Sequence, residues 1–194
     1  MISAIDSFVL HGVEAHACRV EVAVSPDHKP SATVVGLPDA AVRESIDRVR
    51  AAIESSGYPF PFGRVVINLA PGDLRKEGPV YDLPIALALL GSSGVVTLEG
   101  MREARGMLIA GELALDGGVR SVRGIIGLGV LASSQDRAVI VPQADAAAAK
   151  LVHDLRAFEH SRLLDHVCYS NCTIPDENAI ARTCKVAMGL SYWA

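Results

Sequence analysis

Alternating and continuous apolar runs in the first third of the chain predict three strands. Residues 18–24 (CRVEVAV) carry an apolar side chain at every second position, which is the period of a half-buried strand. Residues 31–37 form a second run, and turn-forming residues fill 25–30 between them, so we predict a hairpin over 18–37. Residues 64–71 (RVVINLAP) are largely apolar, which is typical of a central strand.

Two segments have the spacing or the composition of helices. Residues 39–57 place apolar side chains on one helical face, at Val42, Ile46, Val49 and Ile53. Asp39 stands where an N-cap is expected, and Gly57 stands where this helix should end. Residues 83–94 (LPIALALLGSSG) are apolar nearly all round, so we predict a buried helix with Asp82 as its N-cap.

Strands and helices continue to alternate in the second half of the chain. Residues 106–124 predict a strand, an Asp-Gly-Gly turn and a short return strand. A helix over 125–134, a strand over 137–142 and a helix over 143–152 follow, and no period is visible after residue 161. This order predicts an α+β fold, with a mixed sheet and helices packed on it.

Composition and charge narrow the classes of function. Of the 194 residues, 50% are apolar and 5% are aromatic, so aliphatic side chains must fill the core. The formal net charge of −4 argues against autonomous nucleic-acid binding, because phosphate neutralisation needs a concentrated positive face. The sequence has no run of 18 apolar residues and no basic leader, so we expect a cytoplasmic protein without membrane contact.

The cysteines suggest one candidate metal site. Cys18 lies alone in a predicted strand and is expected to be a small buried hydrophobe. The side chains of His166, Cys168, Cys172 and Cys184 could together hold zinc. This segment lacks the glycines and strands of a zinc ribbon, so we expect no metal site there.

Charged residues crowd the segment before the apolar helix, in NLAPGDLRKEGPVYD (68–82). The candidate contact loop consists of Asp73, Arg75, Lys76 and Glu77. One interpretation is structural: glycines and prolines shape a turn, its basic side chains face solvent and pair loosely with its acids, and Asp82 caps the helix. The other is functional: the loop contacts a partner, because charges of both signs can set the register of a contact.

Glu112 is the other carboxylate of interest. It lies between apolar residues in AGELAL, where a carboxylate needs a cationic partner, and Arg120 and Arg123 follow the next turn. We interpret Glu112 as half of a structural ion pair rather than as a catalytic acid.

Several long stretches of the sequence resemble one family. The segment VVGLPDAAVRESIDRVRAAIESSGYPFPFGRVVINLAPGDLRKEGPVYDLPIALALL is similar to the N-terminal domain of the magnesium-chelatase-like AAA+ ATPases, the family of ComM and YifB-like proteins. Two later stretches, AGELALDGGVRSVRGI and AVIVPQADAAAA, match later blocks of that domain in the same order. We therefore predict a domain over residues 1–165 and an irregular tail over 166–194.

This resemblance implies a fold and a cellular setting. It implies the ribosomal-protein-S5-domain-2-like fold, which the proteolytic domain of Lon proteases shares, in a bacterial cytoplasmic protein. In the family, the domain precedes an AAA+ motor that forms rings and uses ATP and Mg, and in ComM the motor drives DNA branch migration during natural transformation. The implied partners are therefore the motor and the ring, with DNA reached only through the assembled ring.

The motor's nucleotide motif is missing from this sequence. The phosphate-binding loop G-x-x-x-x-G-K-[ST] needs a lysine after glycine and before serine or threonine. None of the four lysines has these neighbours: Lys29, Lys76, Lys150 and Lys185. We expect no nucleotide cofactor and no motor in this chain, which a truncated or frame-shifted gene would explain.

The residues of a Lon-type peptidase are missing as well. Such enzymes place a nucleophilic serine directly after a turn like KEGP (76–79) and an activating lysine further along the chain. Here Val80 follows the turn, and residues 122–132 contain no lysine. A nucleophile without its base is weak, so we expect a non-catalytic accessory domain. The alternatives are a degenerate Ser-Lys peptidase domain and a nucleic-acid-binding module.

Overall fold

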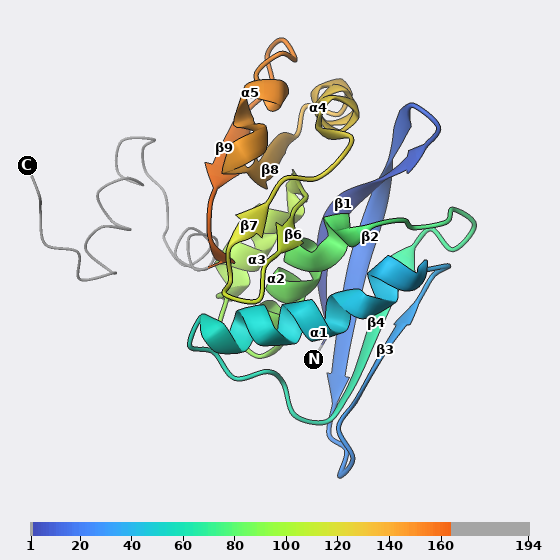
Figure 1. Ribbon diagram of the computed structural model, residues 1–194, viewed down its shortest axis with the longest axis vertical. Coiled ribbons are helices and arrows are strands. Elements are labelled where there is room, and N and C mark those ends of the chain that lie inside the picture. The colour runs from blue at the N-terminus through green and yellow to red at the C-terminus, as the bar shows by residue number, and fades with distance from the viewer. Residues whose placement is uncertain (1, 164–194) are drawn as a thin grey trace, which may run out of the picture.

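Strands and helices alternate along residues 2–163, the part of the chain that the computed structural model describes (Figure 1). The strands are β1 (Ile2–His11), β2 (Glu14–Ser25), β3 (Ser31–Val35), β4 (Arg64–Ala70), β5 (Met107–Ile109), β6 (Glu112–Leu113), β7 (Val119–Arg120), β8 (Ala138–Pro142) and β9 (Ala157–His160). The helices are α1 (Ala40–Ser55), α2 (Asp82–Ser92), α3 (Leu98–Arg105), α4 (Ile125–Ser134) and α5 (Ala146–Ala149), with the 3-10 turns η1 (Pro79–Tyr81) and η2 (Gln143–Asp145).

The largest sheet contains four strands in the order β1-β2-β4-β3. The pairs β1–β2 and β2–β4 are antiparallel, whereas β3 runs parallel to β4. The prediction of an α+β fold with a mixed sheet is confirmed. The interior place of β4 also confirms the prediction of a central strand over 64–71.

Two smaller sheets complete the molecule. Strands β5, β8 and β9 form a parallel sheet, and β6 pairs with β7 as a short antiparallel hairpin. The predicted strand of 106–124 is therefore divided, because β5 and β6 belong to different sheets. Figure 1 shows α4 and α5 beside β8 and β9 at one end, close to the β1–β2 turn.

The core lies between the four-stranded sheet and the helices α1 and α2. Every residue of α2 is buried, as its all-apolar sequence predicts. Helix α1 turns Val42, Val49 and Ile53 into the core, and the Asp39 carboxylate accepts the Val42 N–H at 2.7 Å, which confirms the predicted N-cap. Cys18 is also buried, as expected.

The predicted hairpin over 18–37 is wrong. Strand β4 lies between β2 and β3, and β2 pairs instead with β1, a strand that the alternation analysis did not identify. Alternation identifies a strand but not its partner, and β4 buries Val65, Ile67 and Leu69, so it gains most from a neighbour on each side. Helix α3 and strand β9 were also not predicted, and the helix over 143–152 shortens to η2 and α5.

Two sequence predictions concern the chain beyond this region. The tail over 166–194, with its candidate zinc ligands His166, Cys168, Cys172 and Cys184, lies outside the described residues, as does the boundary at 165. Between residues 2 and 163, none of the helices has the length and apolar character needed to span a membrane.

Candidate functional site

The candidate contact loop is held from within by Lys76. This side chain is 0% exposed, and its ammonium donates hydrogen bonds to the carbonyl oxygens of Leu74, at 2.7 Å, and Pro71. Desolvation lowers the pKa of the Lys76 ammonium. The expectation that Lys76 faces solvent is wrong, because the carbonyls of this tight loop point inward and require a donor there.

The other charged side chains of the loop face outward. Asp73, Arg75 and Glu77 are exposed, and Arg75 Nε lies 3.4 Å from Glu77 Oε1, so the expected loose ion pair is present. With Lys76 turned inward, the loop presents one positive charge between two negative charges.

Asp82 joins three elements of the core. Its carboxylate is completely buried and accepts hydrogen bonds from Arg48 Nε at 2.7 Å, from the Leu113 N–H at 3.2 Å and from the Ser45 hydroxyl. Helix α2 begins at Asp82 itself, with Tyr81 at the N-cap position, so the prediction of Asp82 as an N-cap is wrong. The carboxylate turns toward α1 because Arg48 supplies its counter-charge there.

Burial and hydrogen bonding shift the pKa of the Asp82 carboxyl in opposite directions. Desolvation raises the pKa of Asp82, and the bonds from Arg48 and Ser45 oppose that rise. The same bond raises the pKa of Arg48. This arrangement is a structural ion pair, because both oxygens of Asp82 already have protein donors.

A cleft of about 780 Å³ lies between β1, the 77–81 turn and the segment 121–123; we call it the central cleft. It brings together Glu77, Glu112 and Arg123, which are far apart in the sequence. The other candidate site residues, Asp73, Arg75, Lys76 and Asp82, do not line it. Its lining residues are Phe8, Val9, Leu10, Gly12, Asp39, Glu77, Gly78, Pro79, Val80, Tyr81, Glu112, Ser121, Val122 and Arg123.

Two buried or half-buried acids fix the walls of the central cleft. Asp39 accepts the Gly78 N–H at 3.1 Å in addition to capping α1, and Gly78 adopts a φ of 77°, a conformation that glycine allows. On the opposite wall, Asp145 accepts the Val122 N–H at 3.0 Å and the Ser121 hydroxyl. Both walls are therefore held by side chain–backbone bonds.

Glu112 pairs with Arg120, one of its two expected partners. Arg120 Nη1 lies 3.5 Å from Glu112 Oε1, and the Glu112 side chain is 25% exposed. Glu112 is thus half-buried at the wall of the cleft. Arg123, the other expected partner, is exposed and lines the cleft.

The segments 77–81 and 121–123 meet at the central cleft. Val80 and Val122 both line the cleft, and the described lining residues include no lysine or histidine. The Ser121 hydroxyl donates to Asp145.

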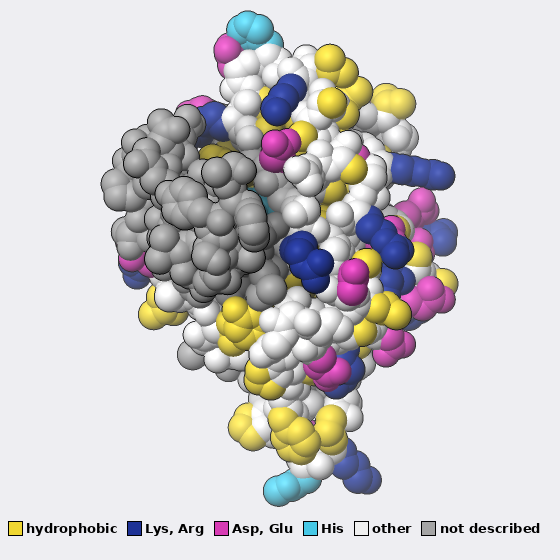
Figure 2. Space-filling model, turned by 60° about the vertical axis from the view of Figure 1, so that its left-hand side comes forward, with side chains coloured by type: hydrophobic (Ala, Val, Ile, Leu, Met, Phe, Trp, Pro, Cys, Tyr) yellow, Lys and Arg dark blue, Asp and Glu magenta, His cyan; other side chains and the backbone are white. Residues whose placement is uncertain are grey.

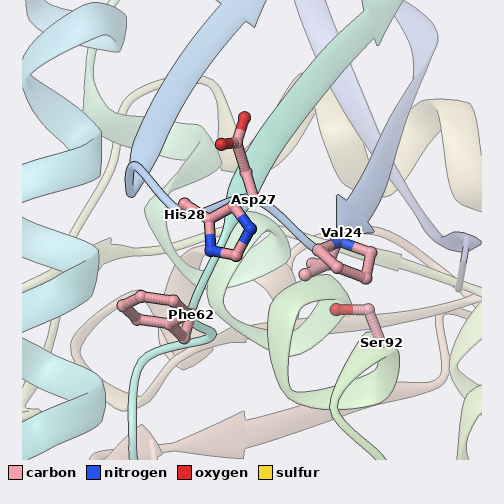
Figure 3. Close-up of a pocket in the computed structure, with 6 residues that line it drawn as sticks. Val24, Asp27, His28, Phe62 and Ser92 are labelled. Carbon is pink, nitrogen blue, oxygen red and sulfur yellow. The ribbon is translucent and has the colours of Figure 1, made fainter.

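A second, more open pocket of about 670 Å³ lies at the far end of the sheet. Figure 3 shows His28 and Phe62 on one side of it and Val24 and Ser92 on the other, while the Asp27 carboxylate points away. Within the described residues, no three His, Cys, Asp or Glu side chains gather closely enough to hold a metal ion. This pocket therefore favours apolar contact rather than metal binding.

The surface charges are mixed in sign. Figure 2 shows lysines and arginines interspersed with acids over the visible face, and apolar side chains near the lower tip. The part of that face formed by described residues shows no concentrated positive region of the kind that phosphate binding requires.

Sequence reasoning missed several residues that organise the molecule. Asp6 accepts hydrogen bonds from Arg19 at 2.9 Å and from Arg137 at 2.8 Å, and the second of these joins β1 to the residue that directly precedes β8. Asp6 stands within an apolar run, and Asp82 stands where the charged segment 73–82 meets the apolar helix. A charge that directly adjoins an apolar run is the signal that could have marked both residues as buried and paired.

Comparison with known proteins gives a consistent picture. The model of the family described as subunit ChlI of Mg-chelatase matches residues 20–145. The uncharacterized protein YifB of Salmonella typhimurium is 45% identical over 141 residues, which is 73% of this chain and 27% of that protein. YifB of Escherichia coli is 47% identical over 130 residues, which is 67% of this chain and 25% of that protein.

A third relative carries a functional name. Competence protein ComM of Haemophilus influenzae is 38% identical over 160 residues, covering 82% of this chain and 31% of that protein. The matched region is therefore between a quarter and a third of the length of each of these relatives.

Proposed function

This chain belongs to the family of subunit ChlI of Mg-chelatase, with YifB and ComM among its relatives, and from that premise we propose that it is a non-catalytic accessory domain of a ComM-type AAA+ ATPase. The fold we assign to it is the ribosomal-protein-S5-domain-2-like fold, which has a mixed sheet covered by helices. Its place of action is the cytoplasm.

The observation that carries the proposal is the composition of the central cleft. Val80, which directly follows the KEGP turn where a Lon-type peptidase needs a serine, lines the cleft, and the described lining residues include no lysine. A cleft that mixes apolar side chains with Asp39, Glu77, Glu112 and Arg123 suits recognition of a partner, whereas bond cleavage requires a nucleophile beside its base.

The proposed activity of the full-length relatives is ATP-driven branch migration of DNA, performed by a ring of motors with ATP and Mg. The accessory domain reaches DNA only as part of that ring. Arg75 is the exposed cation of the contact loop, and its positive charge is partly neutralised by Glu77, whose Oε1 lies 3.4 Å from Arg75 Nε. One such contact is weak, but several copies around a pore would act together, so avidity supplies the affinity.

The rival function is a degenerate peptidase that uses Ser121 of the cleft. A fluorophosphonate probe separates the two proposals, because it labels serines that a neighbouring base activates. We expect no labelling of the native protein above that of heat-denatured protein. Labelling that disappears in a Ser121→Ala variant would replace the accessory role with a catalytic one.

A further inference from the structure

Strand β3 forms one edge of the four-stranded sheet, and the two edges of this sheet differ (Figure 1). The other edge strand, β1, packs against α3 and β5. No described strand pairs with the outer side of β3, and Ser31, Thr33 and Val35 are exposed.

The direction of the outer backbone groups follows from one hydrogen bond. The Ser31 N–H donates to the Gly63 carbonyl at 3.1 Å, so the backbone of Ser31 faces β4. Successive residues of a strand alternate, so Thr33 and Val35 also face β4 in the parallel ladder. The N–H and C=O groups of Ala32 and Val34 therefore point away from the sheet, and they form a row of four backbone groups open to another strand.

Within its five residues, β3 carries no charge, proline or bulge, although Lys29 and Pro30 directly precede it. Natural edge strands carry charged residues, proline or a bulge that prevents pairing with another chain. Residues 31–35 (SATVV) contain no charge and no proline, and their register with β4 is continuous. Two large apolar side chains, Val35 and Leu37, are 42% and 54% exposed at the end of this edge.

We infer that β3 pairs antiparallel with β3 of a second copy of this chain, across a two-fold axis at Thr33. In that register Ala32 lies opposite Val34 of the second copy, and each such pair exchanges two hydrogen bonds. Both copies then satisfy all four of their outward backbone groups. The two sheets become one continuous sheet, and this inference goes beyond the proposed accessory role.

The side chains favour a second copy over an unrelated peptide. Thr33 meets Thr33 of the second copy as a non-hydrogen-bonded pair, the position where side chains approach most closely, and Thr–Thr pairs are favourable there. A five-residue strand pair is small for an interface, so the dimer should be weak and concentration-dependent.

Sedimentation velocity of the full chain from micromolar to millimolar concentration tests this pairing. We expect a reversible monomer–dimer equilibrium. Thr33→Lys should weaken it by about tenfold or more, since it places two ammonium groups opposite each other at the axis. Ser133→Lys, which adds the same charge at an exposed site on α4, should leave the equilibrium unchanged.

Mixing two variants checks the two-fold axis itself. Thr33→Lys and Thr33→Glu should each be monomeric, whereas their equimolar mixture should form a heterodimer, because opposite charges then meet. Recovery in the mixture also shows that both variants are folded. A wild type that stays monomeric throughout, a dimer insensitive to Thr33→Lys, or a mixture that stays monomeric would each overturn the inference.

Discussion

Arg48 Nε lies 2.7 Å from Asp82 Oδ2, and this ion pair joins α1 to the start of the buried helix α2. The Asp82 side chain is completely buried, whereas the Arg48 side chain is 23% exposed. Asp82 directly follows the 77–81 turn in the chain. The ion pair therefore fixes the end of the turn that forms one wall of the central cleft.

We predict that Asp82→Ala lowers the free energy of unfolding by about 3–5 kcal/mol, because it leaves Arg48 and the Leu113 N–H without their acceptor. Asp82→Asn should lower the free energy of unfolding by less, since the amide oxygen can still accept a hydrogen bond. Asp47→Ala on the exposed side of α1 serves as the control and should have no measurable effect. Urea denaturation provides the measurement, and equal effects of Asp82→Ala and Asp47→Ala would contradict the role of Asp82.

Replacing Lys76 and replacing its neighbour Arg75 should have different effects on the free energy of unfolding. Lys76→Ala removes the buried donor of two loop carbonyls, so we expect a loss of about 1–3 kcal/mol in unfolding free energy and faster proteolysis of residues 71–78. Arg75→Ala removes an exposed side chain and should change stability little. If Arg75→Ala destabilised the protein as much as Lys76→Ala, the inward position of Lys76 would be wrong.

The buried thiol of Cys18 gives the stability a pH dependence. Burial raises the pKa of Cys18 from 9.0 to about 12, so the folded chain keeps a proton that the unfolded chain loses. The contribution of Cys18 is fully present below pH 9.0 and is lost as the pH rises toward about 12. Between pH 8 and pH 10 we expect roughly 1 kcal/mol of lost stability from this group.

A Cys18→Ala variant isolates this contribution. Tyr81, whose pKa burial also raises, and the other cysteines are common to both chains, so their effects cancel in the comparison. Urea midpoints at pH 8 and pH 10 should decline less in Cys18→Ala than in the wild type. An equal decline would show that the Cys18 thiol is not shielded.

Residues with a regular period were the predictable part of the fold. The helical spacing of Val42, Val49 and Ile53 and the all-apolar sequence of α2 specify buried faces whatever their partners are, and both were predicted. The insertion of β4 between β2 and β3 was not predictable, because strand pairing depends on contacts between distant residues.

The candidate site was predictable only in part. Composition identifies the charged segment 73–77 but gives no side-chain direction, so it does not predict that Lys76 points inward. Local rules predict a helix cap for Asp82, whereas its partner Arg48 lies on another helix. Local rules miss such long-range pairs, and a charge that directly adjoins an apolar run is the pattern that should prompt a search for one.

The most direct test of the accessory role uses a chimera of ComM from Haemophilus influenzae, in which residues 1–165 of this chain replace the matched segment. The measurement is ATP-dependent branch migration of DNA, with ring formation and ATP hydrolysis as controls for folding. We predict that the chimera migrates branches, that ComM without the segment does not, and that Arg75→Ala in the chimera slows migration while ATP hydrolysis continues. A chimera that forms rings and hydrolyses ATP yet migrates no faster than the deletion would contradict the proposed function.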